Sequence, residues 1–216
     1  MARFRRAALA LIAVLFAAPA FAHPHVFVTA KAEMVFGAGG QLTAVRHIWQ
    51  FDEAFSAYAI QGLDANNDGA LTRAELAPLA QINVDSLAEY NFFTWLTVDG
   101  VPVTFGAATE YFLDIYGGQL VLFFTLPLAT PVTIVRNAAL DVFDPEYFVA
   151  YEFVTDTPIT LVDPPMGCGA LFYPPPFLDQ ATANALAAIP ADERMLPADL
   201  AGAAASLANT IVVTCG

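Results

Sequence analysis

Basic residues are scarce in this sequence, and their scarcity excludes several classes of function. The chain of 216 residues contains 8 Lys and Arg against 21 Asp and Glu, and three of the basic residues, Arg3, Arg5 and Arg6, lie near its start. Proteins that bind nucleic acid or anionic membrane surfaces need clustered positive charge. We therefore expect neither partner, whereas the acidic balance is compatible with cation binding or simply with solubility.

Long apolar runs are missing after the first twenty or so residues. An apolar run from Ala7 to Ala18 follows the basic start, and Ala20-Phe21-Ala22 supplies a small-x-small cleavage site. Residues 1–22 are therefore predicted to be a signal peptide that directs the protein to the periplasm. The longest later run, from Leu120 to Leu128, is shorter than the roughly 20 residues that a membrane helix needs. No membrane span is expected after cleavage.

The sequence contains few cysteines, and it has none of the common catalytic motifs. The two cysteines, Cys168 and Cys215, are expected to form a disulfide in an oxidising compartment. The serines lack the flanking glycines of a nucleophile elbow, and there is no glycine-rich phosphate loop. We therefore expect a protein that is not an enzyme, with a secreted hydrolase as a minor alternative.

Residues 64–75 match the twelve-residue calcium-binding loop of EF-hand proteins. Such a loop takes side-chain oxygens from positions 1, 3, 5 and 9, a backbone carbonyl from position 7 and two carboxylate oxygens from position 12. Oxygen ligands at this spacing suit calcium better than zinc or copper. The ligands expected here are Asp64, Asn66, Asp68, Thr72, Ala70 through its carbonyl, and Glu75, with Gly69 at the sharp turn.

Apolar residues at helical spacing flank this loop on both sides. They recur over residues 51–63 upstream and at Leu71, Leu76 and Leu79 downstream, where Pro78 is expected to bend the helix. The alternative is an ordinary turn, because Asn, Asp and Gly favour turns without calcium. We predict an EF-hand over about residues 52–90 whose calcium is structural, since extracellular loops of this type bind at about 10⁻⁴ to 10⁻³ M.

The rest of the chain up to residue 163 predicts β-strands, and the composition then changes. Asp99-Gly100 and Gly117-Gly118 are two-residue hairpin signals between strands. Proline-rich segments follow residue 163, with alanine-rich helices expected over about 179–189 and 198–209. The predicted fold class is α+β. An antiparallel, β-sandwich-like sheet over 23–163 carries the inserted EF-hand, and 164–216 form a Pro-rich linker and a small helical tail held by the disulfide.

The three histidines are candidate ligands for a transition metal. His23 would be the first residue after cleavage, and His25 shares its side of an extended chain. The terminal amine and two imidazoles suit zinc, nickel, cobalt or copper. His47 is a candidate third imidazole, although it shares a strand face with Trp49 and Phe51, and a packed core histidine is the alternative.

Several short motifs resemble one family. They are His23 to Phe27, His47 to Ser56 with the Asp-x-Asn-x-Asp-Gly loop after it, Tyr90 to Phe93, and Phe143 to Phe148. Together they resemble the uncharacterised bacterial periplasmic proteins grouped as domain of unknown function 1007. The resemblance implies an accessory role in nickel, cobalt or zinc uptake, together with an inner-membrane permease.

These observations predict a periplasmic metal-binding protein that serves a transition-metal transport system and holds calcium structurally. The alternative is a calcium-stabilised secreted protein-interaction module that binds no transition metal.

Overall fold

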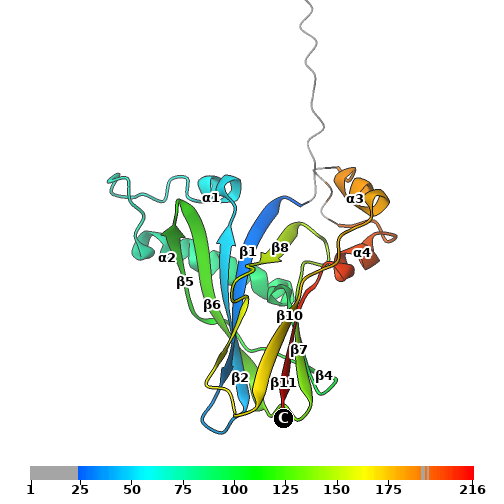
Figure 1. Ribbon diagram of the computed structural model, residues 1–216. Helices are drawn as coiled ribbons and strands as arrows, with labels where there is room; N and C mark the ends of the chain where they lie inside the picture. The colour runs from blue at the N-terminus through cyan, green and yellow to red at the C-terminus, as the bar shows by residue number, and fades with distance from the viewer. Residues whose placement is uncertain (1–23, 191–192, 194) are drawn as a thin grey trace, which may run out of the picture.

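The computed structural model describes residues 24–190, 193 and 195–216, and these residues are built mainly from two β-sheets (Figure 1). The six-stranded sheet has the order β5-β6-β2-β1-β8, with β9 also paired to β1, and the five-stranded sheet has the order β10-β11-β7-β3-β4. The strands of the first sheet are β1 (Val26–Phe36), β2 (Leu42–Phe51), β5 (Thr109–Tyr116), β6 (Gln119–Val132), β8 (Val149–Phe153) and β9 (Ile159–Val162). Those of the second are β3 (Thr94–Val98), β4 (Val101–Val103), β7 (Asn137–Val142), β10 (Cys168–Tyr173) and β11 (Asn209–Cys215).

β1 lies inside the first sheet, and its side chains alternate strictly between a buried face and a more exposed one. Every second residue from Val26 to Phe36 is buried, and the residues between them are exposed or half-buried. β1 pairs with β2 in antiparallel fashion, with Val28 opposite Phe51. β8 and β9 pair with the other edge of β1 in parallel, an arrangement that no local sequence pattern indicates.

Aromatic side chains form the core that the two sheets share. Trp49 on β2 is 1% exposed, and its ring centroid lies 4.8 Å from those of Phe124 and Tyr151. Phe153 of β8 and Phe172 of β10 join the two sheets with centroids 5.4 Å apart. Truncating a buried aromatic side chain to alanine typically destabilises a protein by about 3–5 kcal/mol, so such contacts hold the sheets together.

Two helices connect the sheets along the chain between β2 and β3. The first helix, α1 (Glu53–Ala59), is capped by Asp52, whose carboxylate accepts the amides of Phe55 and of Phe27 on β1. The second, α2 (Arg73–Glu89), packs across β5 with Leu76, Ala80 and Val84 buried. A short 3-10 turn, η1 (Asn91–Phe93), leads from α2 into β3.

The predicted α+β fold with an inserted EF-hand is wrong. The chain is mostly β, with two sheets and only four short α-helices among the described residues. In an EF-hand the first helix leads directly into the calcium loop, whereas α1 ends at Ala59 and an irregular stretch, 60–63, separates it from Asp64. None of the helices in the described ranges is long and apolar enough to cross a membrane.

The predicted helical tail is also wrong, because the last segment contributes two strands to the second sheet. β11 lies between β10 and β7 in that sheet, so its apolar residues Ile211 and Val213 are fully buried. Two short helices, α3 (Gln180–Ala187) and α4 (Ala201–Ser206), lie in the connection between β10 and β11. The expected signal peptide, 1–22, lies outside the described residues.

The predicted disulfide is confirmed. Cys168 and Cys215 are bonded, and they lie opposite each other in the antiparallel pairing of β10 with β11. The bond therefore closes the long connection that carries α3 and α4 and holds the edge strand β10 against the sheet.

Replacing both cysteines by serine is expected to lower the free energy of unfolding by about 2–4 kcal/mol, because a loop of this length gains conformational entropy in the unfolded chain. Urea denaturation of the wild-type protein and of the double variant measures the difference. A reducing agent should destabilise the wild-type protein and leave the variant unchanged. An equal midpoint for the two proteins would show that the bond does not stabilise the fold.

Candidate functional site: the loop and groove between α1 and α2

The loop that precedes α2 is wound tightly by its own polar side chains. Asp64 accepts hydrogen bonds from the amides of Asp68 (3.2 Å) and Gly69 (2.9 Å). Asn66 accepts from the Asp68 amide, and Asp68 in turn accepts from the Ala70 amide at 2.8 Å. Gly69 has a φ of 82°, a conformation that favours glycine. The side chains expected to bind calcium thus shape the turn by accepting hydrogen bonds from backbone amides of the loop.

Glu75 joins the two ends of this loop. One carboxylate oxygen accepts the amide of Ala65 at 3.1 Å, and the other accepts the amide and the hydroxyl of Thr72 at 2.9 and 2.8 Å. Thr72 and Glu75 form a capping box that begins α2. These donors, the Thr72 amide first, lower the pKa of Glu75 and keep its carboxylate ionised.

The expected calcium ligands share one turn, but their carboxylates do not face one centre. Across the described residues, no three His, Cys, Asp or Glu side chains are grouped as a metal site. The Asn66 amide nitrogen donates to Asp68 at 2.8 Å, so the Asn66 oxygen points elsewhere. Oxygen and nitrogen of an amide exchange places by a simple flip, and a cation would favour the flipped arrangement. The donor set is all oxygen and fits calcium once the carboxylates leave their amide donors.

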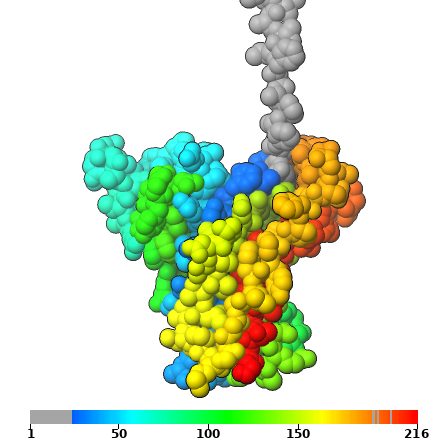
Figure 2. Space-filling model, viewed as in Figure 1, coloured from blue at the N-terminus to red at the C-terminus, as the bar shows by residue number. Residues whose placement is uncertain are grey.

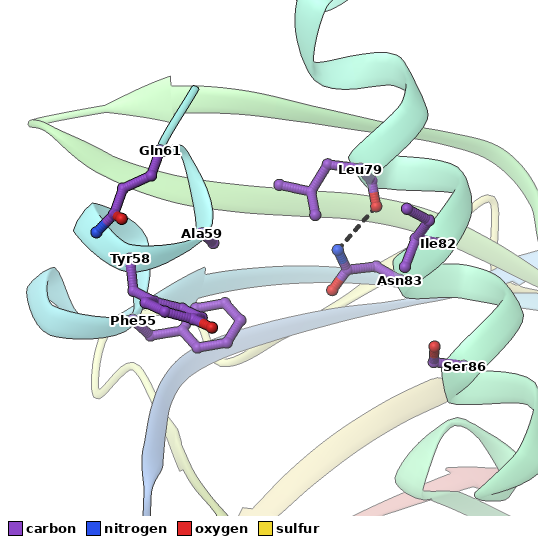
Figure 3. Close-up of a pocket in the computed structure, with 8 residues that line it drawn as sticks. All are labelled: Phe55, Tyr58, Ala59, Gln61, Leu79, Ile82, Asn83 and Ser86. Atoms are coloured by element: carbon purple, nitrogen blue, oxygen red, sulfur yellow. Dashed lines mark hydrogen bonds between the residues drawn. The ribbon is translucent and has the colours of Figure 1, made fainter. Parts of the chain in front are cut away.

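A groove of about 500 Å³ lies between α1 and α2, beside this loop (Figure 3). Most of its lining is apolar, yet the Tyr58 side chain is 74% exposed and that of Ile82 is 61% exposed. The lining residues are Phe55, Tyr58, Ala59 and Gln61 from the α1 side and Leu79, Ile82, Asn83 and Ser86 from α2. The apolar spacing in the sequence predicted helices here but gave no sign that apolar side chains between them stay exposed, so the groove was missed.

Buried contacts fix α1 against the sheet on one side of this groove. Ser56 is 1% exposed, donates to the Phe51 carbonyl and accepts the Leu120 amide at 3.0 Å. On the other side, Arg73 at the start of α2 donates to Asp114 of β5 at 2.7 Å. Both groove walls are therefore anchored to the first sheet, and the loop spans the space between them. In Figure 2 this segment forms one projecting corner of the molecule.

His47 is a core histidine in this structure. It is 1% exposed, and its ring stacks on Phe124 with centroids 4.9 Å apart. Thr94 donates its single proton to the Phe92 carbonyl, so the 3.2 Å contact requires His47 to donate from Nε2 to Thr94. Nδ1 is buried without a partner in the described part of the chain. Burial lowers the pKa of His47 to about 3, so the ring is neutral.

The structure does not bring His25 and His47 together. His47 lies opposite Ala32 on β1, seven residues along the chain from His25, which corresponds to roughly 20 Å of extended strand. His25 lies at the start of β1 and stacks on Phe148 with centroids 4.6 Å apart. His23 lies outside the described residues. The expected transition-metal site therefore depends on His23 and His25 without His47.

Short motifs from distant parts of the sequence meet in the core beside His47. Trp49 and Phe93 both pack on Tyr151, and Trp95 packs on Phe143 at 4.3 Å. Asp144 accepts the amides of Glu146, Phe148 and Val149, so it shapes the turn that contacts His25. These segments therefore stabilise the fold around His47 and the turn at Asp144.

A protein-family model covers nearly the whole chain, including all of these motifs. Residues 8–215 match the model of a family described as "Protein of unknown function (DUF1007)". The chain belongs to this family. It is also 26% identical over 141 residues to an uncharacterized protein of Haemophilus influenzae, a match that covers 64% of this chain and 66% of that relative. The match thus spans slightly less than two thirds of the relative's length.

The pH dependence of stability tests the placement of His47. Because its folded pKa is about 3 and the unfolded value is 6.5, the unfolded chain alone binds a proton between these pH values. Stability is therefore full above pH 6.5 and is lost as pH falls towards 3. We expect wild-type protein to lose about 2 kcal/mol more than His47→Gln between pH 7 and pH 5.

Urea denaturation at the two pH values measures this difference. Carboxylate titrations occur in both proteins and cancel from the comparison. Parallel pH profiles for wild type and His47→Gln would contradict the burial of a neutral ring.

Proposed function

We propose that this protein is a calcium-stabilised, extracytoplasmic interaction protein. The observation that carries the proposal is the closure of the loop 64–75. Glu75 reaches back to the amide of Ala65, so the first and last ligand positions are neighbours. The sequence supplies six oxygen ligands at calcium spacing on this loop, and the periplasmic assignment rests on the predicted signal peptide.

Charge repulsion gives calcium a physical role in this loop. Asp64, Asp68 and Glu75 lie on one turn, and Arg73, the basic residue beside them, is bonded to Asp114 at 2.7 Å. Like charges this close destabilise a loop unless a cation is present. A bound calcium ion would offset the repulsion and fix the chain between α1 and α2.

An interaction role agrees better with the geometry than metal delivery does. The groove between α1 and α2 exposes Tyr58 and Ile82, large apolar side chains that soluble proteins usually bury or cover with a partner. A role in zinc, nickel, cobalt or copper transport with an inner-membrane permease needs a histidine site, and His47 is too deeply buried to supply a ligand. That role stays a prediction that depends on His23 and His25.

Calcium titration of the purified protein tests the proposal. We expect one site with a Kd of about 10⁻⁴ to 10⁻³ M by isothermal titration calorimetry. Glu75→Gln should weaken binding about tenfold or more, because the position that normally gives two anionic oxygens loses its charge. Glutamine retains the capping box with Thr72, so α2 should persist.

Asp85→Asn provides the matched control. It removes one negative charge from the exposed surface of α2 outside the loop, and calcium affinity should change little. Equal weakening by Asp85→Asn and Glu75→Gln would indicate diffuse electrostatic attraction, and the absence of any calcium binding up to about 10 mM, above the expected range, would overturn the proposal.

A further inference from the structure

The groove between α1 and α2 has one apolar stripe that no described residue covers. The apolar side chains of Leu79 and Ile82, followed by the small polar Ser86, have the three- and four-residue spacing that places side chains on one helix face. Phe55 and Tyr58 of α1 lie opposite, and their rings extend into the space between the two helices (Figure 3). Such a channel between two helices has the shape that accepts the apolar face of a third helix.

Acidic residues flank this stripe. On the helix surface Glu89 lies three residues after Ser86 and shares its face. Glu53 is exposed in the first turn of α1, on the opposite wall. The groove floor itself has no charged residue. The arrangement is an apolar channel with a negative residue at one end and another on its outer wall.

Positive charge is almost missing from the surface around the groove. Twenty of the 21 Asp and Glu lie in the described ranges, all but Asp192, against four Lys and Arg. Three of these four, Arg46, Arg73 and Arg136, are in salt bridges with carboxylates. In residues 52–90 Arg73 is the single basic residue. A ligand that approaches this corner of the molecule therefore meets a negative field.

We propose that the groove binds a cationic amphipathic helix of a partner protein, with apolar side chains in the channel and Lys or Arg beside its acidic edges. Helices of this kind bind in grooves through anchors at helical spacing, and complementary charge directs their association. Tyr58 and Ile82 are the contacts that a partner would cover. This inference rests on the proposed interaction role, whereas the groove walls themselves are anchored to the first sheet through Ser56 and Arg73.

The negative charge around the groove disfavours two other possible occupants, a second copy of this chain and an anionic lipid surface. A second copy of this chain would bring its own acidic residues against the same negative surface, at a cost in repulsion. An anionic lipid surface would be repelled in the same way. A cationic helix gains from both the charge and the apolar area.

The test uses a fluorescent synthetic helix of roughly 18 residues, built from Leu, Ala and Lys with Leu at helical spacing. A peptide of the same composition with Leu scrambled tests the role of the apolar face. We expect the amphipathic peptide to bind the purified protein in fluorescence polarisation about tenfold or more tightly than the scrambled one, and Ile82→Asp or Tyr58→Asp to abolish most of that preference.

Leu171→Asp is the matched control. Leu171 on β10 is 62% exposed and Ile82 is 61% exposed, so the two substitutions add the same charge to equally exposed aliphatic positions. The control should leave binding unchanged. Equal losses for the two variants, equal binding of both peptides, or binding to anionic vesicles in place of the peptide would each overturn the proposal. Self-association of the wild-type protein that Ile82→Asp abolishes would identify a second copy as the occupant and would overturn it too.

Repeating the peptide titration with calcium and with a chelator separates the two proposals. Groove-dependent binding in both conditions supports the docking site, and the calorimetric titration alone then decides the calcium proposal. Calcium binding with no preference between the peptides would refute the docking site and leave the calcium loop intact.

Discussion

Burial of aromatic side chains between the two sheets is the interaction on which the rest of the structure depends. Trp49, Phe124 and Tyr151 fill the centre of the core, and the neutral ring of His47 packs among them. The same strands carry the outer features of the molecule. Asp52, directly after β2, bonds to the amide of Phe27 on β1 and caps α1. The core thus fixes the place where the helices and their loop begin.

The packed core and the projecting corner formed by α1, the loop and α2 differ in their charge. The core tolerates a histidine because burial holds its pKa near 3 and keeps it uncharged. The loop concentrates carboxylates at the surface, where backbone amides donate hydrogen bonds to them. The calcium and docking proposals both follow from this contrast. The corner has unbalanced negative charge and an uncovered apolar channel, whereas the two sheets bury their apolar side chains in a shared core.

The sequence predicted those parts of the structure that depend on local chemistry. The strands β1 and β2, the turn at Asp99-Gly100 and the disulfide all follow from residue patterns a few positions long or from the cysteine count. The pairing of strands that are far apart in the sequence could not be predicted from such patterns. Nothing near Ile211 indicates that β11 lies between β10 and β7 in the second sheet. Helical periodicity over residues 51–63 and at Leu71, Leu76 and Leu79 predicted the helices but not which apolar residues stay exposed.

Calcium is proposed to bind at the loop 64–75 and to affect the two helices beside it. Amide-resolved NMR during a calcium titration is the sharpest test of this proposal. We expect the largest shifts at the amides of Ala65, Asp68, Gly69, Ala70 and Thr72, because these donate to the carboxylates and the Asn66 amide oxygen that calcium would engage. Smaller shifts should extend to the residues that line the groove. Unchanged loop amides, or shifts confined to the sheets, would contradict it.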